Sequence, residues 1–307
     1  MQAKQVRWIG GLLAAAVLVL GGCATLDEQQ RKWIFQPSKD NWGGTSADGM
    51  QDRWIEFTPP GAEAPVKLHA LWMPQANADA PVMLYLHGAR WGVTSSSFRM
   101  RRLHALGVSV LGVDYRGFGL STDALPSETT AYQDARAAWD WLRAQYPRRQ
   151  RLIYGHSLGS AIAIHLAAEV DDEAGVVVEG GFTSVPDVFS TMRFGWLPLK
   201  PLITQRFDAA QRIAEVGSPV LVVHGAQDRM IQPALGRALY EQAREPKRFI
   251  LAENGTHHNA QAMVSDQVRD AMHSLFGLPS GSSAARSSSV SMSISTPGSS
   301  TSTPNDG

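Results

Sequence analysis

The chain of 307 residues has a single cysteine, Cys23, and no excess of charge of either sign. One cysteine cannot form an intramolecular disulfide, and no cysteine–histidine cluster suggests a metal, so we expect neither a metal nor an organic cofactor. Lys and Arg total 28, as do Asp and Glu. This balance argues against a nucleic-acid partner, which would require a basic face. The hydrophobic content of 44% allows one large domain with a sizeable core.

The N-terminus has the pattern of an export signal. Lys4 and Arg7 precede the apolar run WIGGLLAAAVLVL, which is too short to span a membrane comfortably. The following Leu20-Gly21-Gly22-Cys23 resembles a bacterial lipoprotein signal. We therefore expect a signal peptide at 1–22 and a lipidated Cys23, followed by an anchor and linker up to residue 49. An ordinary signal peptide or an anchor helix are the alternatives.

The resemblance to lipoproteins also suggests a location. The second residue of the mature chain would be Ala24, not aspartate. In Gram-negative lipoproteins this resembles the default signal for the outer membrane. We therefore expect attachment to the outer membrane through Cys23, with the protein facing the periplasm.

The C-terminal segment, residues 280–307, is rich in serine and poor in core-forming residues. It contains 12 serines and no aromatic residue. Such a segment cannot bury enough apolar surface to offset its ordering entropy, so we predict disorder there. The folded domain is expected to cover residues 50–279.

Within that domain, short apolar runs alternate with helical patterns. The first two runs, 54–57 and 66–73, have no helix between them, so we expect them to pair as an antiparallel edge. Later runs are nearly continuous in apolar residues, which is typical of buried parallel strands; they lie at 81–88, 108–115, 151–155, 175–181, 219–225 and 247–253. Helical patterns cover residues 130–146, 158–170, 234–244 and 259–276. The chain is therefore predicted to form a mostly parallel α/β sheet with helices on both faces.

A G-x-S-x-G pattern stands between a predicted strand and a predicted helix. It reads Gly155-His156-Ser157-Leu158-Gly159. In this context the serine lies on a sharp turn that exposes its hydroxyl, and the flanking glycines avoid crowding. The Leu158 N–H would be free at the helix N-terminus to stabilise an oxyanion. Ser157 is therefore a candidate nucleophile.

The partners of such a serine follow it in the chain, first an acid and then a histidine. Asp228 ends the run VLVVHGAQD and is the favoured acid, because it follows a strand at the same edge of the sheet. The other acids considered, which we interpret as surface or structural groups, are Asp171, Asp172 and Asp208. The loop NGTHHN supplies two adjacent histidines, His257 and His258, and both are candidates for the base.

The body resembles an α/β-hydrolase of the BEM46-like group, close to the serine aminopeptidase S33 type domain. The stretches that carry this resemblance are LYLHGARWGVT, GVSVLGVDYRGFGLST, YGHSLGSAIA, SPVLVVHGAQDRMI and GTHHN. The resemblance implies that the Ala89 N–H is the second oxyanion donor. It also selects His258, because the closing motif of the family has histidine followed by asparagine. Relatives often have asparagine after the HG, where this chain has Ala89-Arg90-Trp91.

The resemblance implies a serine hydrolase that forms an acyl-enzyme, with Ser157, Asp228 and His258 as its triad. Carboxylic esters, small or lipid-derived, are the expected substrates; thioesters or peptides are alternatives, and so is a non-catalytic lipoprotein that serves as a binding module. Residues 183–217 would form a small cap. Its apolar residues could line an acyl pocket, but we favour the interpretation that they pack the cap on the sheet. Oligomeric state has no signature in the sequence.

Overall fold

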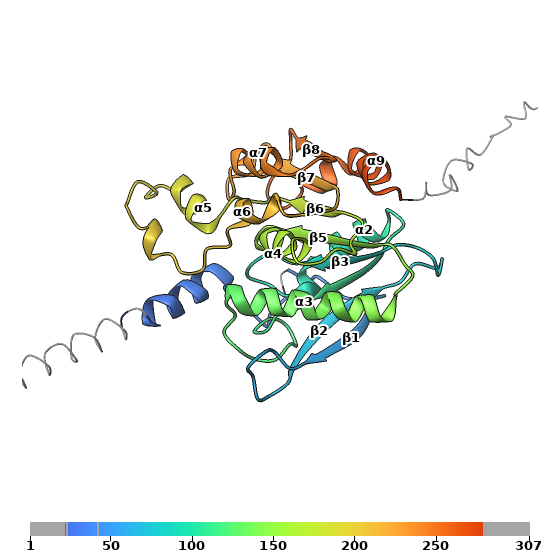
Figure 1. Ribbon diagram of the computed structural model, residues 1–307, viewed down its shortest axis with the longest axis horizontal. Helices are drawn as coiled ribbons and strands as arrows, with labels where there is room; N and C mark the ends of the chain where they lie inside the picture. Colours follow the sequence, from blue (N-terminus) through green and yellow to red (C-terminus); the bar gives the residue numbers. More distant parts are fainter. Residues whose placement is uncertain (1–21, 23, 42, 279–307) are drawn as a thin grey trace, which may run out of the picture.

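A computed structural model describes residues 22, 24–41 and 43–278 of the chain. Its centre is one eight-stranded sheet with the order β1-β2-β4-β3-β5-β6-β7-β8 (Figure 1). The strands are β1 (Gln51–Phe57), β2 (Val66–Met73), β3 (Val82–Leu86), β4 (Ser109–Val113), β5 (Arg151–His156), β6 (Val176–Glu179), β7 (Val220–Gly225) and β8 (Lys247–Ala252). All eight predicted strands are present.

The strand pairing follows the expected division into an antiparallel edge and a parallel sheet. β1 pairs antiparallel with β2, and β2 pairs antiparallel with β4. Every later pair, from β4–β3 to β7–β8, is parallel. The central strands are buried on both faces, which explains their continuous apolar sequences.

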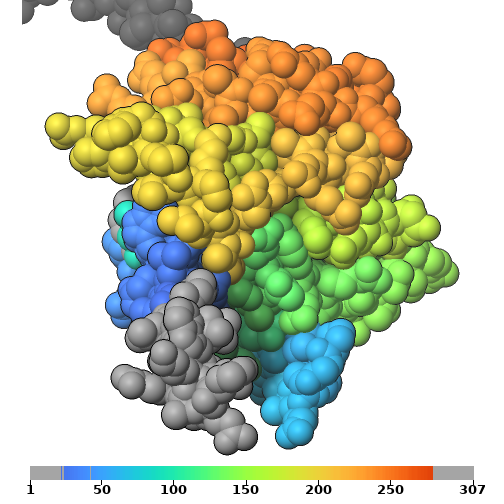
Figure 2. All heavy atoms as spheres, turned by 60° about the vertical axis from the view of Figure 1, so that its left-hand side comes forward, coloured from blue at the N-terminus to red at the C-terminus, as the bar shows by residue number. Residues whose placement is uncertain are grey.

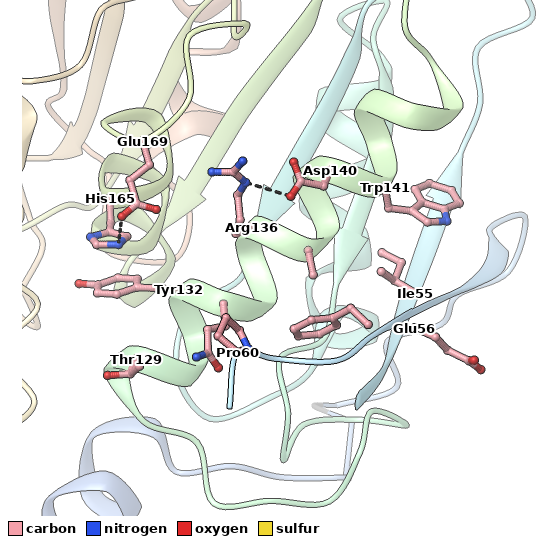
Figure 3. A pocket seen from close by; sticks show the side chains of 13 residues that line it. Ile55, Glu56, Pro60, Thr129, Tyr132, Arg136, Asp140, Trp141, His165 and Glu169 are labelled. Carbon is pink, nitrogen blue, oxygen red and sulfur yellow. Dashed lines mark hydrogen bonds and ion pairs between the residues drawn. The ribbon is translucent and has the colours of Figure 1, made fainter. Parts of the chain in front are cut away.

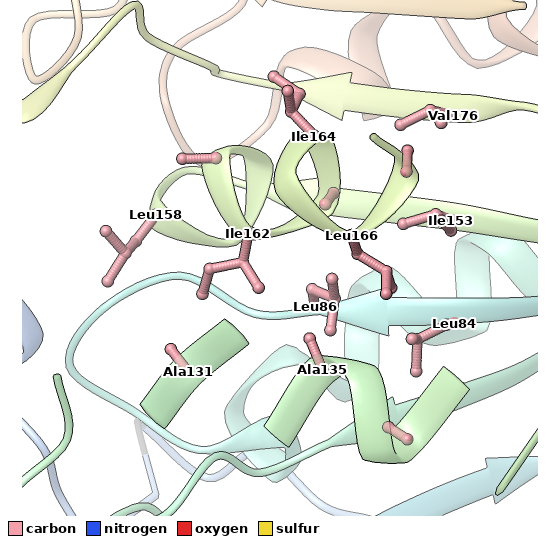
Figure 4. Packing of buried hydrophobic residues seen from close by; sticks show 14 of the residues in the cluster. Leu84, Leu86, Ala131, Ala135, Ile153, Leu158, Ile162, Ile164, Leu166 and Val176 are labelled. Carbon is pink, nitrogen blue, oxygen red and sulfur yellow. The ribbon is translucent and has the colours of Figure 1, made fainter. Parts of the chain in front are cut away.

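Helices cover both faces of this sheet. One core cluster lies under α3 (Glu128–Gln145), α4 (Leu158–Ala167), α6 (Ala209–Ile213) and α7 (Pro233–Gln242). The other lies under α2 (Ser97–His104), α8 (Ala260–Met263) and α9 (Ser265–Phe276); η1 (Val93–Ser96) precedes α2. Figure 4 shows α4 and α3 packed against the sheet, with Ile162 and Leu166 of α4 near Leu84 and Leu86 of β3. Burying each such side chain contributes about 1.5–3 kcal/mol.

The order of the strands places a crevice at one position of the sheet. β3 lies between β4 and β5, so the chain leaves β3 toward one side and β5 toward the other. In open α/β sheets, ligands bind at such a switch point, beyond the carboxyl ends of the strands. Here the segment after β3 begins with His87-Gly88-Ala89, and β5 is followed by Ser157. The predicted nucleophile and oxyanion loop therefore lie next to each other.

Four α-helices were not predicted, among them α5 (Val185–Thr191) and α6 (Ala209–Ile213) of the cap; the other two lie outside the cap. One is α2, whose buried side chains include Arg99. The other covers residues 24–35, within the segment expected to be anchor and linker, and it ends at the fully buried Phe35. The predicted helix at 259–276 is divided into α8 and α9 at Val264.

The cap contains α5 (Val185–Thr191), η2 (Lys200–Leu202) and α6. Phe207 and Ile213 bury its C-terminal part against the core. The expectation that its apolar residues pack the cap on the sheet is wrong for five side chains, which are exposed: Met192, Phe194, Trp196, Leu199 and Leu202.

Residues 1–21 of the predicted signal peptide, Cys23 and the serine-rich tail lie outside the described residues. Among the helices that are described, none has both the length and the hydropathy needed to cross a membrane.

Candidate active site

Ser157 occupies a strained turn between β5 and α4. Its φ is 55° and its ψ is −122°, a combination that costs energy for a residue with a side chain. The flanking glycines make the turn possible. A Cβ on Gly155 would lie 2.2 Å from the Gly159 carbonyl oxygen, and a Cβ on Gly159 would lie 2.1 Å from that of Leu86. The turn predicted from G-x-S-x-G is therefore present.

Ser157 is connected to Asp228 through His257. His257 Nε2 lies 2.9 Å from Ser157 Oγ, and His257 Nδ1 lies 2.7 Å from Asp228 Oδ2. His257 and Asp228 are buried, whereas Ser157 is partly exposed. These distances allow one ring to accept the serine proton while the carboxylate holds its other nitrogen.

The prediction of His258 as the base is wrong. Its side chain is exposed, and within the described residues it makes no hydrogen bond to Ser157 or Asp228. The reason is a turn closed by Asn259. The Asn259 side-chain oxygen accepts hydrogen bonds from the Thr256 N–H and hydroxyl, at 2.7 and 2.9 Å. This turn directs His257 inward and His258 outward, so the histidine of the site precedes the asparagine by two residues.

Asp228 is held as a carboxylate. Its Oδ1 accepts hydrogen bonds from the N–H groups of Met230 and Ile231, at 2.9 and 2.8 Å. Burial opposes ionisation of Asp228, but hydrogen bonds from His224, His257 and the Ile231 N–H outweigh it and lower its pKa well below the usual range. Asp228 therefore stays charged and can stabilise a protonated His257.

Two backbone N–H groups are placed to hold an oxyanion. Leu158 begins α4, where the first N–H groups have no partner within the helix. Gly88 is adjacent to Ser157, since a Cβ added to it would lie 3.0 Å from the Ser157 Cβ. Within the described residues, neither the Leu158 nor the Ala89 N–H donates to a backbone carbonyl outside regular elements. Leu158 and Gly88 thus adjoin Ser157, and the N–H groups of Leu158 and Ala89 stay the predicted oxyanion donors.

Comparisons with known proteins identify the family of the chain. The family model described as serine aminopeptidase, S33, matches residues 77–208. An uncharacterized protein of Mycobacterium tuberculosis (strain ATCC 25618 / H37Rv) is 31% identical over 87% of this chain and 94% of its own length. The chain belongs to the α/β-hydrolase superfamily.

Other members of the superfamily match more distantly. Lysophosphatidylserine lipase ABHD12 of Danio rerio is 29% identical over 54% of this chain and 48% of its own length. The Pyrococcus furiosus esterase Pf2001 has a TM-score of 0.61 at 19% identity, covering 78% of this chain and 98% of that one. This structural match supports the α/β-hydrolase fold.

A buried ion pair between Arg99 and Glu179 contacts the loop that carries His257 and His258 in this α/β-hydrolase. Arg99 Nε lies 3.3 Å from Glu179 Oε2, and Arg99 Nη2 donates to the His258 carbonyl at 2.9 Å. The same nitrogen lies 3.0 Å from His156 Nε2. Burial, and next the charge of Arg99, lower the pKa of His156 well below its usual value, so this ring is neutral. Tyr154 donates to Glu179 at 2.8 Å.

Sequence reasoning missed Arg99, Glu179 and His156. One signal was available, because Glu179 ends the run VVVE, where a charged residue closes an otherwise apolar buried strand. A buried charge of this kind requires a partner. Nothing in the sequence near Arg99 identifies it as that partner.

A hollow of about 700 Å³ lies apart from Ser157, between β1, α3 and α4. Figure 3 shows two pairs among its polar side chains, Arg136 with Asp140 and His165 with Glu169. Its lining includes none of the three site residues. In the part of the chain that is described, no cluster of three or more His, Cys, Asp or Glu side chains is arranged to hold a metal ion.

Proposed function

We propose that this α/β-hydrolase is a serine hydrolase that cleaves carboxylic esters through an acyl-enzyme. The observation that carries the proposal is the hydrogen-bonded series from Ser157 Oγ through His257 to Asp228, at 2.9 and 2.7 Å, on a strained turn. A serine hydroxyl is a weak nucleophile alone and needs a base within hydrogen-bond reach. His257 meets that requirement.

In the first half of the reaction, Ser157 Oγ attacks the ester carbonyl carbon and its proton passes to His257 Nε2. The N–H groups of Leu158 and Ala89 stabilise the oxyanion. The tetrahedral intermediate collapses, the bond to the leaving oxygen breaks, and His257 gives that oxygen its proton. Asp228 stabilises the charged imidazole throughout this half.

In the second half, water attacks the acyl carbon and gives a proton to His257. The bond to Ser157 Oγ breaks, His257 returns the proton to that oxygen, and the carboxylic acid leaves. This sequence uses the protein's own groups for each proton transfer.

We propose small or lipophilic esters as substrates. A Danio rerio relative is named as a lysophosphatidylserine lipase, and the cap carries five exposed apolar side chains. We also propose that the mature protein is a lipoprotein held by Cys23 in the outer membrane and facing the periplasm, as the signal pattern suggests. This location would place the enzyme beside lipid-derived esters.

A series of p-nitrophenyl esters of rising chain length tests the proposed activity. The parent protein should hydrolyse them, and Ser157→Ala should lower kcat by about 10⁴-fold or more. A thioester and an aminoacyl p-nitroanilide, measured in parallel, should have lower kcat/KM. Hydrolysis that survives Ser157→Ala would contradict the proposal, and faster turnover of the anilide would replace the esterase with a peptidase.

A further inference from the structure

The helix of residues 24–35 and the cap segment that it contacts both carry exposed apolar side chains. Trp196 is 78% exposed, Phe194 58% and Trp33 55%. We call this set the apolar face: Leu26, Trp33, Phe194, Trp196, Leu199 and Leu202. Large exposed apolar sets in soluble domains mark interaction surfaces.

Hydrogen bonds join the two halves of the apolar face. Leu26, Gln30 and Trp33 are spaced by four and three residues, so they lie on one side of the helix. Gln30 Nε2 donates to the Leu202 carbonyl at 2.7 Å, and Gln30 Oε1 accepts from the Thr204 N–H at 2.8 Å. The helical side that carries Leu26 and Trp33 therefore adjoins η2. Figure 2 shows the blue N-terminal residues directly against the yellow residues of the cap.

The same helix is connected to the catalytic site. Its last residue, Phe35, accepts a hydrogen bond on its carbonyl from the Arg90 N–H at 2.8 Å. Arg90 directly follows Ala89, one of the two proposed oxyanion donors. The Phe35 ring packs on Phe207 of the cap, with centroids 5.7 Å apart. The apolar face therefore lies on the side of the sheet where Ser157 is placed, and Figure 1 shows the helix and the cap on that common side.

We propose that the apolar face docks on the surface of a phospholipid bilayer. The first reason is chain continuity, because Cys23, the proposed site of lipid attachment, directly precedes the helix that carries Leu26 and Trp33. A second reason is composition, since tryptophan and phenylalanine are favoured at membrane interfaces. Charge is a third: residues 192–203 contain no acidic residue, and although Lys200 pairs with Asp187 at 3.0 Å, Arg193 remains to attract anionic lipids.

Docking in this orientation determines how substrate arrives. The cap and the oxyanion loop would adjoin the lipid surface, so esters with acyl chains would pass from the bilayer to Ser157 without crossing bulk water. This consequence rests on the proposed hydrolase function. The docking itself does not.

The single native cysteine makes a direct test possible. In the full chain with Cys23→Ser, Trp196→Cys places one environment-sensitive fluorophore on the apolar face, and Asp266→Cys places it on α9. Asp266 is a matched control, because its side chain is 88% exposed and α9 lies at the far side of the molecule (Figure 1). Both proteins are mixed with phosphatidylcholine–phosphatidylglycerol vesicles that contain a spin-labelled quencher lipid.

We expect the probe at 196 to shift to shorter wavelength and to be quenched at least about twofold, as burial in lipid requires, and the probe at 266 to change little. Equal quenching at both positions, or none at 196 in protein that sediments with the vesicles, would overturn the proposal. So would protein that stays off the vesicles altogether.

Two rival occupants give different signals. Shielding of the probe at 196 before vesicles are added would show that the chain's own N-terminal segment covers the face. Shielding that grows with protein concentration would show a second copy. Either result contradicts the proposal. Fluorophosphonate labelling of the same two proteins reports Ser157 separately, so failure of docking and failure of the hydrolase function remain distinguishable.

Discussion

His257 lies between Ser157 and Asp228 because of the turn that Asn259 closes. The Asn259 side chain accepts two hydrogen bonds from Thr256, and Arg99 holds the carbonyl of His258. These contacts point successive side chains in opposite directions. A shift of one residue would take the ring out of reach of Ser157, so the assignment of the base depends on this local geometry.

Substitution of each histidine tests this assignment. His257→Ala should lower kcat for ester hydrolysis by about 10⁴-fold or more, because Ser157 loses its base. His258→Ala is the matched control, and its kcat should stay within about threefold of the parent, as for other exposed side chains. Steady-state kinetics on one p-nitrophenyl ester measures both. A larger loss of kcat in His258→Ala than in His257→Ala would contradict the assignment of His257 as the base.

Arg99 is a positioning residue, because it contacts the carbonyl behind the catalytic ring and not the reacting atoms. Arg99→Lys keeps the charge beside Glu179 but loses the branched guanidinium, whose second nitrogen donates to the His258 carbonyl. We expect kcat to fall about 10–100-fold with KM nearly unchanged, because small displacements of catalytic groups are costly.

The control for Arg99 is Arg101→Lys on the same helix, where the guanidinium holds the carbonyls of Asp48 and Ser46. Arg101→Lys should leave kcat near that of the parent. A similar kcat for both variants, or a change in KM alone, would show that Arg99 does not position His257.

At the scale of elements, His69 connects three segments. It lies on β2, with Nδ1 3.0 Å from Asp114 Oδ2 and Nε2 2.9 Å from Asp52 Oδ1. Burial alone would lower the pKa of His69, but the hydrogen bonds to Asp114 and Asp52 outweigh it and raise the pKa above 6.5. The protonated ring therefore ties the antiparallel edge to the segment after β4.

The raised pKa sets the direction of a pH effect. A histidine whose pKa is higher in the folded than in the unfolded protein stabilises the fold. This contribution is complete below the pKa of the unfolded state and is lost as pH rises through the pKa of the folded state. His69→Gln should therefore lower Tm more at pH 6 than at pH 9, with a loss of about 1.5–3 kcal/mol at the lower pH. Calorimetry at both pH values measures the difference, with His104→Gln as the control. Equal losses at the two pH values would contradict the interpretation.

The strands were predictable because their signal is local. Runs such as Val82–Leu86 and residues 220–223 are apolar at every position, as burial on both faces requires. The turn at Ser157 was predictable for a similar reason, because its glycines are required sterically. The helix α2 escaped prediction because its buried side includes Arg99, whose partner Glu179 lies 80 residues away. The choice of His257 also depends on contacts beyond its neighbours.

At the scale of the whole molecule, the helix of residues 24–35 directly follows Cys23 and packs on the hydrolase domain. Asp27 Oδ1 accepts hydrogen bonds from Thr204 and Gln205 of the cap, at 2.7 and 2.8 Å. This segment is strongly polar, so its sequence resembles a linker, and only its packing on the cap reveals its role. A lipid attached at Cys23 would hold the cap close to the bilayer.

Lipidation at Cys23 is itself testable. In cells supplied with labelled palmitate, the full chain should incorporate label and Cys23→Ser should incorporate none, because the chain has no other cysteine. Gel fluorography of the immunoprecipitated protein measures the incorporation. Label that persists in Cys23→Ser would contradict the lipoprotein assignment. That assignment stays a prediction, and so does the narrower BEM46-like grouping.

The central claim is that Ser157 is a nucleophile activated by His257. The most direct measurement exposes the full chain, Ser157→Ala and His257→Ala to a fluorescent fluorophosphonate, with thermal unfolding to establish that each is folded. We predict rapid labelling of the parent, none of Ser157→Ala, and labelling of His257→Ala slowed by about 10³-fold or more. A folded parent that takes no label, or a Ser157→Ala variant labelled as fast as the parent, would contradict the account.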